Sequence, residues 1–167
     1  MNQAVDVLTL RVLRKPHPQQ RTRTAVQGGK PIRYTPKATR NAQATIRNAF
    51  LYTVEGRDWE PWEGPVELSI VVALAVPSSC PQWRAEAIEK EGWICPKHGD
   101  LDNYAKTVQD ALNGLAYADD RQITALHARK VWVVGPAYTD IVLYLREGNP
   151  RTLKEYKELN AEKGEEE

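Results

Sequence analysis

The sequence lacks any apolar run that approaches the roughly 18 residues of a membrane span, and it has no apolar signal segment near its N-terminus. It has only two cysteines, Cys80 and Cys95, and they form no CxxC pair. There is no internal repeat, no GxxxxGK(S/T) loop, no GxGxxG turn after a strand and no Ser-His-Asp arrangement. These absences argue against a membrane span, a disulfide framework and a nucleotide-binding loop, and we expect a cytoplasmic protein.

A zinc site is also poorly supported. Cys95 and His98 are spaced like half of such a site, and Cys80 could supply a third ligand. No fourth ligand is evident, so the pattern favours free cysteines.

Charge is distributed unevenly along the 167 residues, although the net charge is only +1. Residues 1–50 carry ten Lys and Arg against one acid, residues 51–146 carry nine against fourteen, and residues 147–167 carry four against seven. A basic arm joined to an acidic centre suits a metal-dependent enzyme that acts on a polyanion, because the arm binds phosphates and the acids bind the cation. The alternative is a basic face that is merely solvated.

The most informative stretch is residues 100–122. Its first part predicts a helix over 101–114 with Asp100 as N-cap and Gly114 as the left-handed stop. Asp102, Lys106 and Asp110 follow at i+4 steps on the polar side. The opposite side is an apolar stripe of Leu101, Tyr104, Ala105, Val108, Ala111, Leu112 and Leu115.

Asp119 and Asp120 follow this helix in a polar turn. Taken separately, the acids of the helix start could be caps and those of the turn could bond their own backbone. Taken together, a helix start and a nearby strand entrance can bring several carboxylates to one point, which suits a hard cation such as magnesium.

The rest of the pattern predicts an α+β fold: one domain with a mixed β-sheet of about four to five strands and helices packed mainly on one face. The chain alternates between predicted strands and helices, and Gly28-Gly29 marks a turn. Strands are predicted over 5–13, 66–76, 123–134 and 139–145, the last two as an antiparallel pair, and helices over 36–54, capped by Thr35-Pro36, and 81–91. Residues 151–167 predict a marginal charged helix with a frayed end.

Segment 77–99 is the least regular internal part of the chain. We interpret its tryptophans, Trp83 and Trp93, as core anchors. The alternative is a flap over a nucleic acid, with these rings stacking on bases.

Three blocks of residues resemble the RusA family of Holliday junction resolvases, small endodeoxyribonucleases that are largely of phage and prophage origin. They are Asp100-Leu101-Asp102-Asn103 with Lys106, Asp110-Ala111-Leu112-Asn113-Gly114, and Asp119-Asp120-Arg121-Gln122-Ile123. The basic segments Gln20–Arg23 and Tyr34–Lys37 and the strand Leu126–Val131 also match, so the resemblance covers about residues 7–146.

The resemblance implies a magnesium-dependent homodimer, with manganese as a possible substitute, that cuts branched DNA by paired nicks across a four-way junction in recombination and repair. It implies a domain over 1–146, with a DNA-binding part over 14–40, a flap-like segment over 77–99 and a metal site over 100–122, followed by a charged tail over 147–167.

The resemblance also implies roles for individual residues. Asp100, Asp102 and Asp120 match the acids that bind the metal, with Asp119 beside them, and Lys106 matches a catalytic lysine. An ion pair with Asp102 or Asp110 is the alternative role for Lys106. We expect Asn103, Asp110 and Gln122 to contact the metal-binding residues without binding the metal themselves. The residues expected to contact DNA are Arg21, Arg23, Lys37, Arg40, Lys97, His98 and Arg129.

Two other functions stay open at this point. A non-catalytic DNA-binding protein could carry the same acids as caps, turns or a structural metal site. A flap- or fork-directed nuclease could use the same site on a different branched DNA.

Overall fold

The computed structural model describes residues 4–92, 99–148 and 157. Four strands form one mixed sheet in the order β1-β6-β4-β5. The two outer positions belong to β1 (Ala4–Val12) and β5 (Ile123–Val133), and the two inner ones to β6 (Tyr138–Arg146) and β4 (Val66–Ala75). β6 is antiparallel to both of its neighbours, whereas β4 and β5 are parallel.

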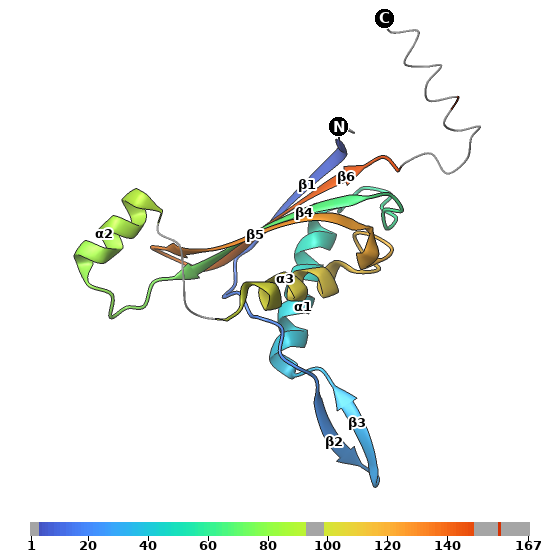
Figure 1. Cartoon of the computed structure of the whole chain (residues 1–167), viewed down its shortest axis with the longest axis horizontal. Helices are drawn as coiled ribbons and strands as arrows, with labels where there is room; N and C mark the ends of the chain where they lie inside the picture. The colour runs from blue at the N-terminus through green and yellow to red at the C-terminus, as the bar shows by residue number, and fades with distance from the viewer. Residues whose placement is uncertain (1–3, 93–98, 149–156, 158–167) are drawn as a thin grey trace, which may run out of the picture.

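One face of this sheet forms the core. Alternate residues of a strand point to opposite faces, and the alternation in β1, β4 and β6 places their apolar residues on the same side. The buried set is Leu8, Leu10, Val12, Val66, Leu68, Ile70, Val72, Ile141, Leu143 and Leu145. Helices α1 (Lys37–Thr53) and α3 (Leu101–Leu112) cover this face and pack against each other (Figure 1). The predicted mixed sheet with helices mainly on one face is therefore confirmed.

The predicted pairing of the last two strands is wrong. β6 does not pair with β5, because β4 lies between them and bonds to both. The reason lies in the burial of β4, which is apolar along most of its length and takes an inner position with a partner on each side. The turn at Gly135-Pro136 therefore carries the chain past the end of β4 rather than into a hairpin.

Strands β2 (Arg23–Gln27) and β3 (Lys30–Tyr34) form a separate antiparallel hairpin that projects from the body (Figure 1). Gly28 and Gly29 make its turn with φ of 58° and 78°, the positive values that a tight two-residue hairpin turn requires. Every residue of the two strands except Ala25 is exposed, so the hairpin contributes little to the core.

Two helix starts differ from the prediction in detail. α1 begins at Lys37 with Pro36 in the N-cap position and no side-chain cap, one residue later than the predicted Thr35-Pro36 start. α2 (Gln82–Glu91) likewise begins one residue later than the predicted 81–91 helix. It projects beyond one end of the sheet, and Ile88 is its one buried residue (Figure 1).

Because α2 makes so little contact, Trp83 is 64% exposed and is not a core anchor, which corrects our interpretation. Trp93 lies outside the described residues. In the part of the chain that the structure describes, no helix is both long and apolar enough to cross a membrane.

Candidate nuclease site

Helix α3 presents the predicted polar face. Its stripe of Tyr104, Ala105, Val108, Ala111 and Leu112 is buried against the sheet and α1. That burial fixes the rotation of the helix about its axis, so the i+4 series of Asp102, Lys106 and Asp110 faces outward. The helix ends at Leu112, and Gly114 adopts the expected left-handed conformation with φ of 68°.

The acidic turn is a short 3-10 helix, η1 (Asp120–Gln122), capped by Asp119. Both carboxylate oxygens of Asp119 accept hydrogen bonds from the Arg121 guanidinium at 2.9 Å, and one also accepts from the Arg121 backbone N–H at 2.9 Å. The side-chain bonds from Arg121 are the main cause that lowers the pKa of Asp119 to about 2. Asp119 thus has the turn-forming role that the alternative interpretation gave it.

Gln122 fastens this turn to the body. Its side-chain Nε2 donates to the carbonyls of Trp62 and Gly64, each at 2.8 Å, and its Oε1 accepts from the Asp119 N–H at 2.7 Å. Gln122 therefore fixes the position of the segment that begins with Asp120, and its support of a metal site stays a prediction.

Lys106 joins the two acidic blocks. Its Nζ lies 2.8 Å from Asp110 Oδ1 and 3.7 Å from Asp120 Oδ2, although Asp120 belongs to the separate turn. The hydrogen bond that Lys106 donates to Asp110 is the largest cause that raises the pKa of Lys106, so the ammonium form is favoured. Residues predicted from two separate motifs are thus brought together around one cation.

Asp100 and Asp102 lie at the start of α3 with exposed side chains. Asp100 occupies the N-cap position, but its side chain forms no capping bond with the helix. Within the described residues, neither carboxylate forms an ion pair, and Lys106 pairs with Asp110 rather than with Asp102. Neither capping nor pairing with a described residue therefore accounts for these two acids.

The donors suit a hard divalent cation in their chemistry, because Asp100, Asp102 and Asp120 are carboxylates and the first two have no ion-pair partner in the part of the chain that the structure describes. Among residues 4–92, 99–148 and 157, no three acidic, His or Cys side chains converge closely enough to hold a metal ion. The Lys106 ammonium lies between the carboxylates of Asp110 and Asp120. The metal site stays a prediction.

Tyr117 is bonded to α3 beside the acidic residues, and sequence reasoning did not predict this contact. The side chain is fully buried, and its hydroxyl donates to the Gln109 carbonyl at 3.0 Å. Burial raises the pKa of this phenol, and the nearby carboxylates of Asp120 and Asp110 raise it further. The neutral hydroxyl therefore serves as a fixed donor under α3.

The segment before the hairpin is docked on α3, a contact that sequence reasoning missed. Gln19 N–H donates to the Asn103 carbonyl at 2.8 Å, and Thr107 Oγ1 donates to the His17 carbonyl at 3.0 Å. Gln20 N–H donates to Thr39 Oγ1 on α1 at 3.3 Å. Thr39 and Thr107 are both buried, and each uses its hydroxyl to hold this segment.

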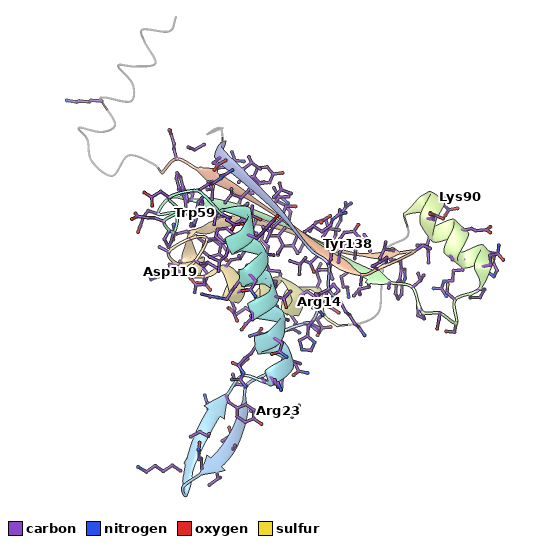
Figure 2. The ribbon with its side chains drawn as sticks, turned by 180° about the vertical axis from the view of Figure 1, so that it is seen from behind. Arg14, Arg23, Trp59, Lys90, Asp119 and Tyr138 are labelled. Carbon is purple, nitrogen blue, oxygen red and sulfur yellow. The ribbon has the colours of Figure 1, made fainter. Side chains whose placement is uncertain are left out.

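The basic residues expected to contact DNA fall into two groups. Arg21, Arg23, Lys37 and Arg40 are all exposed and lie around the base of the hairpin and the start of α1, with Arg23 labelled in Figure 2. Lys97 and His98, like Cys95, lie outside the described residues.

Arg129 lies apart from this group, on the sheet face that α1 and α3 leave uncovered. The register pairs Arg129 with Val71 and the next residue, Lys130, with the buried Val72. Lys130 therefore points to the helix side, where its Nζ donates to the Gly99 carbonyl just before α3 at 2.6 Å. The structure thus places Lys130, which we did not predict, beside the start of the acidic helix.

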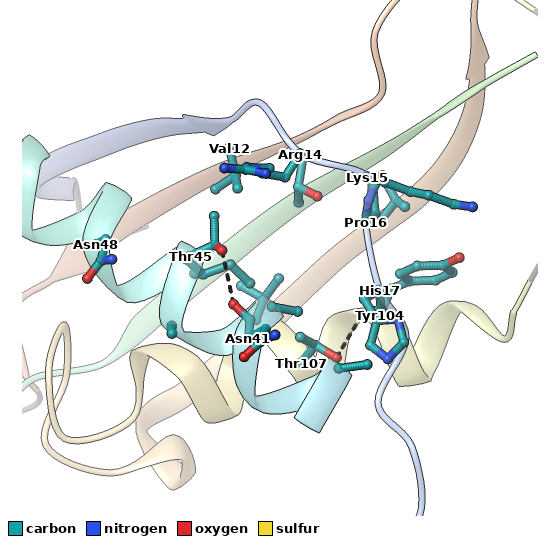
Figure 3. A pocket seen from close by; sticks show the side chains of 17 residues that line it. Val12, Arg14, Lys15, Pro16, His17, Asn41, Thr45, Asn48, Tyr104 and Thr107 are labelled. Carbon is teal, nitrogen blue, oxygen red and sulfur yellow. Dashed lines mark hydrogen bonds between the residues drawn. The ribbon is translucent and has the colours of Figure 1, made fainter. Parts of the chain in front are cut away.

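A pocket of about 600 Å³ lies between the end of β1, the docked segment, α1 and α3 (Figure 3). Its labelled lining includes Arg14, Lys15 and His17 from the docked segment and Asn41 and Thr45 from α1. None of the acids of α3 or η1 is among its described lining residues. The acidic cluster is therefore a surface site beside this pocket and not its floor.

The structure combines a mixed sheet, an exposed row of acids and a projecting basic hairpin. Residues 14–142 match the family model described as Endodeoxyribonuclease RusA, which spans the hairpin, α1, α3, η1 and most of the sheet. The chain belongs to this endodeoxyribonuclease family. It is also similar to the uncharacterized protein YqaN of Bacillus subtilis (strain 168), with 28% identity over 134 residues, covering 79% of this chain and 92% of that protein.

Proposed function

We propose that the protein is a magnesium-dependent, structure-specific endodeoxyribonuclease that resolves four-way DNA junctions by paired, symmetric cuts. Membership of the RusA endodeoxyribonuclease family supports the nuclease activity. The observation that carries the proposal is the meeting of α3 and η1 at Lys106, 2.8 Å from Asp110 and 3.7 Å from Asp120. Two acidic motifs that are separate in sequence thus form one surface site.

Hydrolysis of a phosphodiester needs an activated water, a polarised phosphate and a stabilised leaving oxygen. Asp100, Asp102 and Asp120 would hold magnesium, or manganese in its place. Such an ion supplies Lewis acidity, which lowers the pKa of bound water and offsets negative charge. Lys106 would neutralise charge that develops on the phosphate, and its raised pKa keeps it protonated for that task.

The DNA backbone would be held by Arg21, Arg23, Lys37 and Arg40. Contacts of this kind position a duplex without reading its sequence. Lys130, which lies beside Gly99 at the start of α3, is well placed to add a contact close to the acids.

We propose a homodimer because a four-way junction with twofold symmetry needs two cuts that are related by that symmetry. Each protomer would supply one set of Asp100, Asp102, Asp120 and Lys106. A role in recombination and repair follows from the same substrate.

The test is a panel of end-labelled substrates with and without magnesium: a four-way junction, a flap, a replication fork and a linear duplex. We expect symmetric paired nicks on the junction that need magnesium. Preferential cutting of the flap or fork would replace the resolvase by a flap- or fork-directed nuclease. Tight binding of every branched DNA without cutting under magnesium or manganese would contradict the enzyme proposal.

A further inference from the structure

Gln19 connects the basic arm to the acidic site by a direct hydrogen bond. Its Nε2 donates to Asp110 Oδ2 at 2.9 Å, across 91 positions of sequence. The other oxygen of the same carboxylate, Asp110 Oδ1, binds Lys106 Nζ at 2.8 Å. Asp110 therefore uses one oxygen for the docked segment and the other for the lysine that faces Asp120.

We propose that Gln19 is a positioning residue of the nuclease site, which fixes Asp110 and, through it, Lys106. This inference rests on the proposed function, because positioning matters only if Lys106 acts on DNA. A carboxylate that is held at both oxygens has one rotamer available, whereas one held only by a flexible lysine can rotate.

The surroundings of Gln19 keep its amide in place. The Gln19 backbone N–H donates to the Asn103 carbonyl at 2.8 Å, so the residue is attached to α3 about two turns before Asp110. Its Oε1 accepts from Gln43 Nε2 on α1 at 3.4 Å. This donor identifies the oxygen side of the amide, so the amide N–H of Gln19 points toward Asp110.

The position of Gln19 in the chain gives this bond a further consequence. Arg21 follows two residues later, a separation of about 7 Å in extended chain. A phosphate bound by Arg21 would therefore pull on a segment that is bonded directly to Asp110. The same contact would transmit the position of the bound DNA to the lysine of the site.

Gln20 provides a matched control for this proposal. It is the neighbouring residue, of the same type and similarly half-buried, but among the described residues only its backbone N–H forms a hydrogen bond, to Thr39. Gln20→Ala therefore removes a glutamine side chain from the same segment and leaves the contact with Asp110 in place.

The experiment compares cleavage of a four-way junction in magnesium by wild type, Gln19→Ala, Gln19→Glu, Gln20→Ala, Asp110→Ala and the double variant Gln19→Ala/Asp110→Ala. We expect Gln19→Ala to lower kcat about 10-fold with KM within about twofold of wild type, as the loss of a supporting contact does at other sites. Gln19→Glu, of nearly the same size, should lower kcat at least as much because its carboxylate faces Asp110. Gln20→Ala should change neither constant by more than about twofold, and Gln19→Ala should have no further effect in the Asp110→Ala background.

Equal loss of kcat in Gln19→Ala and Gln20→Ala, or a rise in KM alone, would overturn the proposal, because either result assigns the segment to DNA binding only. A second readout needs no activity: urea unfolding of wild type, Gln19→Ala, Asp110→Ala and the double variant. Less-than-additive destabilisation by Gln19→Ala and Asp110→Ala is expected, and additivity would overturn the contact. If wild type cuts no substrate, the proposed function fails while the unfolding cycle still decides the Gln19–Asp110 link.

Discussion

Gln122 should contribute more to stability than its partly exposed position suggests. Replacing it with Ala removes three side-chain hydrogen bonds, those to the Trp62 and Gly64 carbonyls and that from the Asp119 N–H. A hydrogen bond contributes about 0.5–1.5 kcal/mol net, which gives a loss of about 2–4 kcal/mol. The Trp62 carbonyl keeps a bond from the Ala118 N–H at 3.1 Å, so we expect the lower half of that range.

Urea unfolding measures this loss directly, and for a chain of this length the Tm should fall by about 2–4 °C per kcal/mol. Gln27→Ala is the matched control, because Gln27 is an exposed glutamine next to the hairpin turn and its variant should stay within about 0.5 kcal/mol of wild type. A Gln122→Ala protein as stable as Gln27→Ala would refute the role of Gln122 in holding the acidic turn.

Two further predictions follow from the described contacts. Because Arg121 lowers the pKa of Asp119 from 3.8 to about 2, the stability that this pair adds is present above pH 3.8 and is lost as the pH falls toward 2. Thermal unfolding measured as a function of pH should show this loss in wild type and not in Asp119→Asn. Trp59→Ala should lower the free energy of unfolding by about 3–5 kcal/mol, because the ring packs edge-on against Phe50 with 5.5 Å between the ring centroids and its N–H donates to the Leu115 carbonyl. Trp83→Ala is the control, because Trp83 is exposed and its loss should change stability by no more than about 0.5 kcal/mol. Equal effects of the two substitutions in urea unfolding would contradict the burial pattern.

The helix of the site could be predicted because its signals are local and periodic. The apolar stripe from Tyr104 to Leu112 fixes which side of α3 is buried, and Gly114 marks its end. The alternation in β1, β4 and β6 likewise identifies the buried face. Alternation does not determine which strand lies beside which, and this is why the insertion of β4 between β5 and β6 was missed.

The contacts that organise the site could not be predicted in this way. Gln19 lies in a polar segment with no periodicity, and its partner Asp110 is distant in sequence, so only the folded chain reveals the bond. Trp83 shows the opposite failure: a large apolar ring predicts burial, but α2 projects from the body and leaves the ring exposed.

We propose that the acids of α3 and η1 form the site that cuts DNA, and this claim can be tested in one experiment. The most direct test is single-turnover cleavage of a four-way junction at saturating protein in magnesium, with wild type and Asp102→Asn, and with binding measured in the same samples. We expect Asp102→Asn to bind the junction as wild type does and to cut it at least 100-fold more slowly, because a metal ligand is lost. Equal cutting rates for the two proteins would contradict the claim.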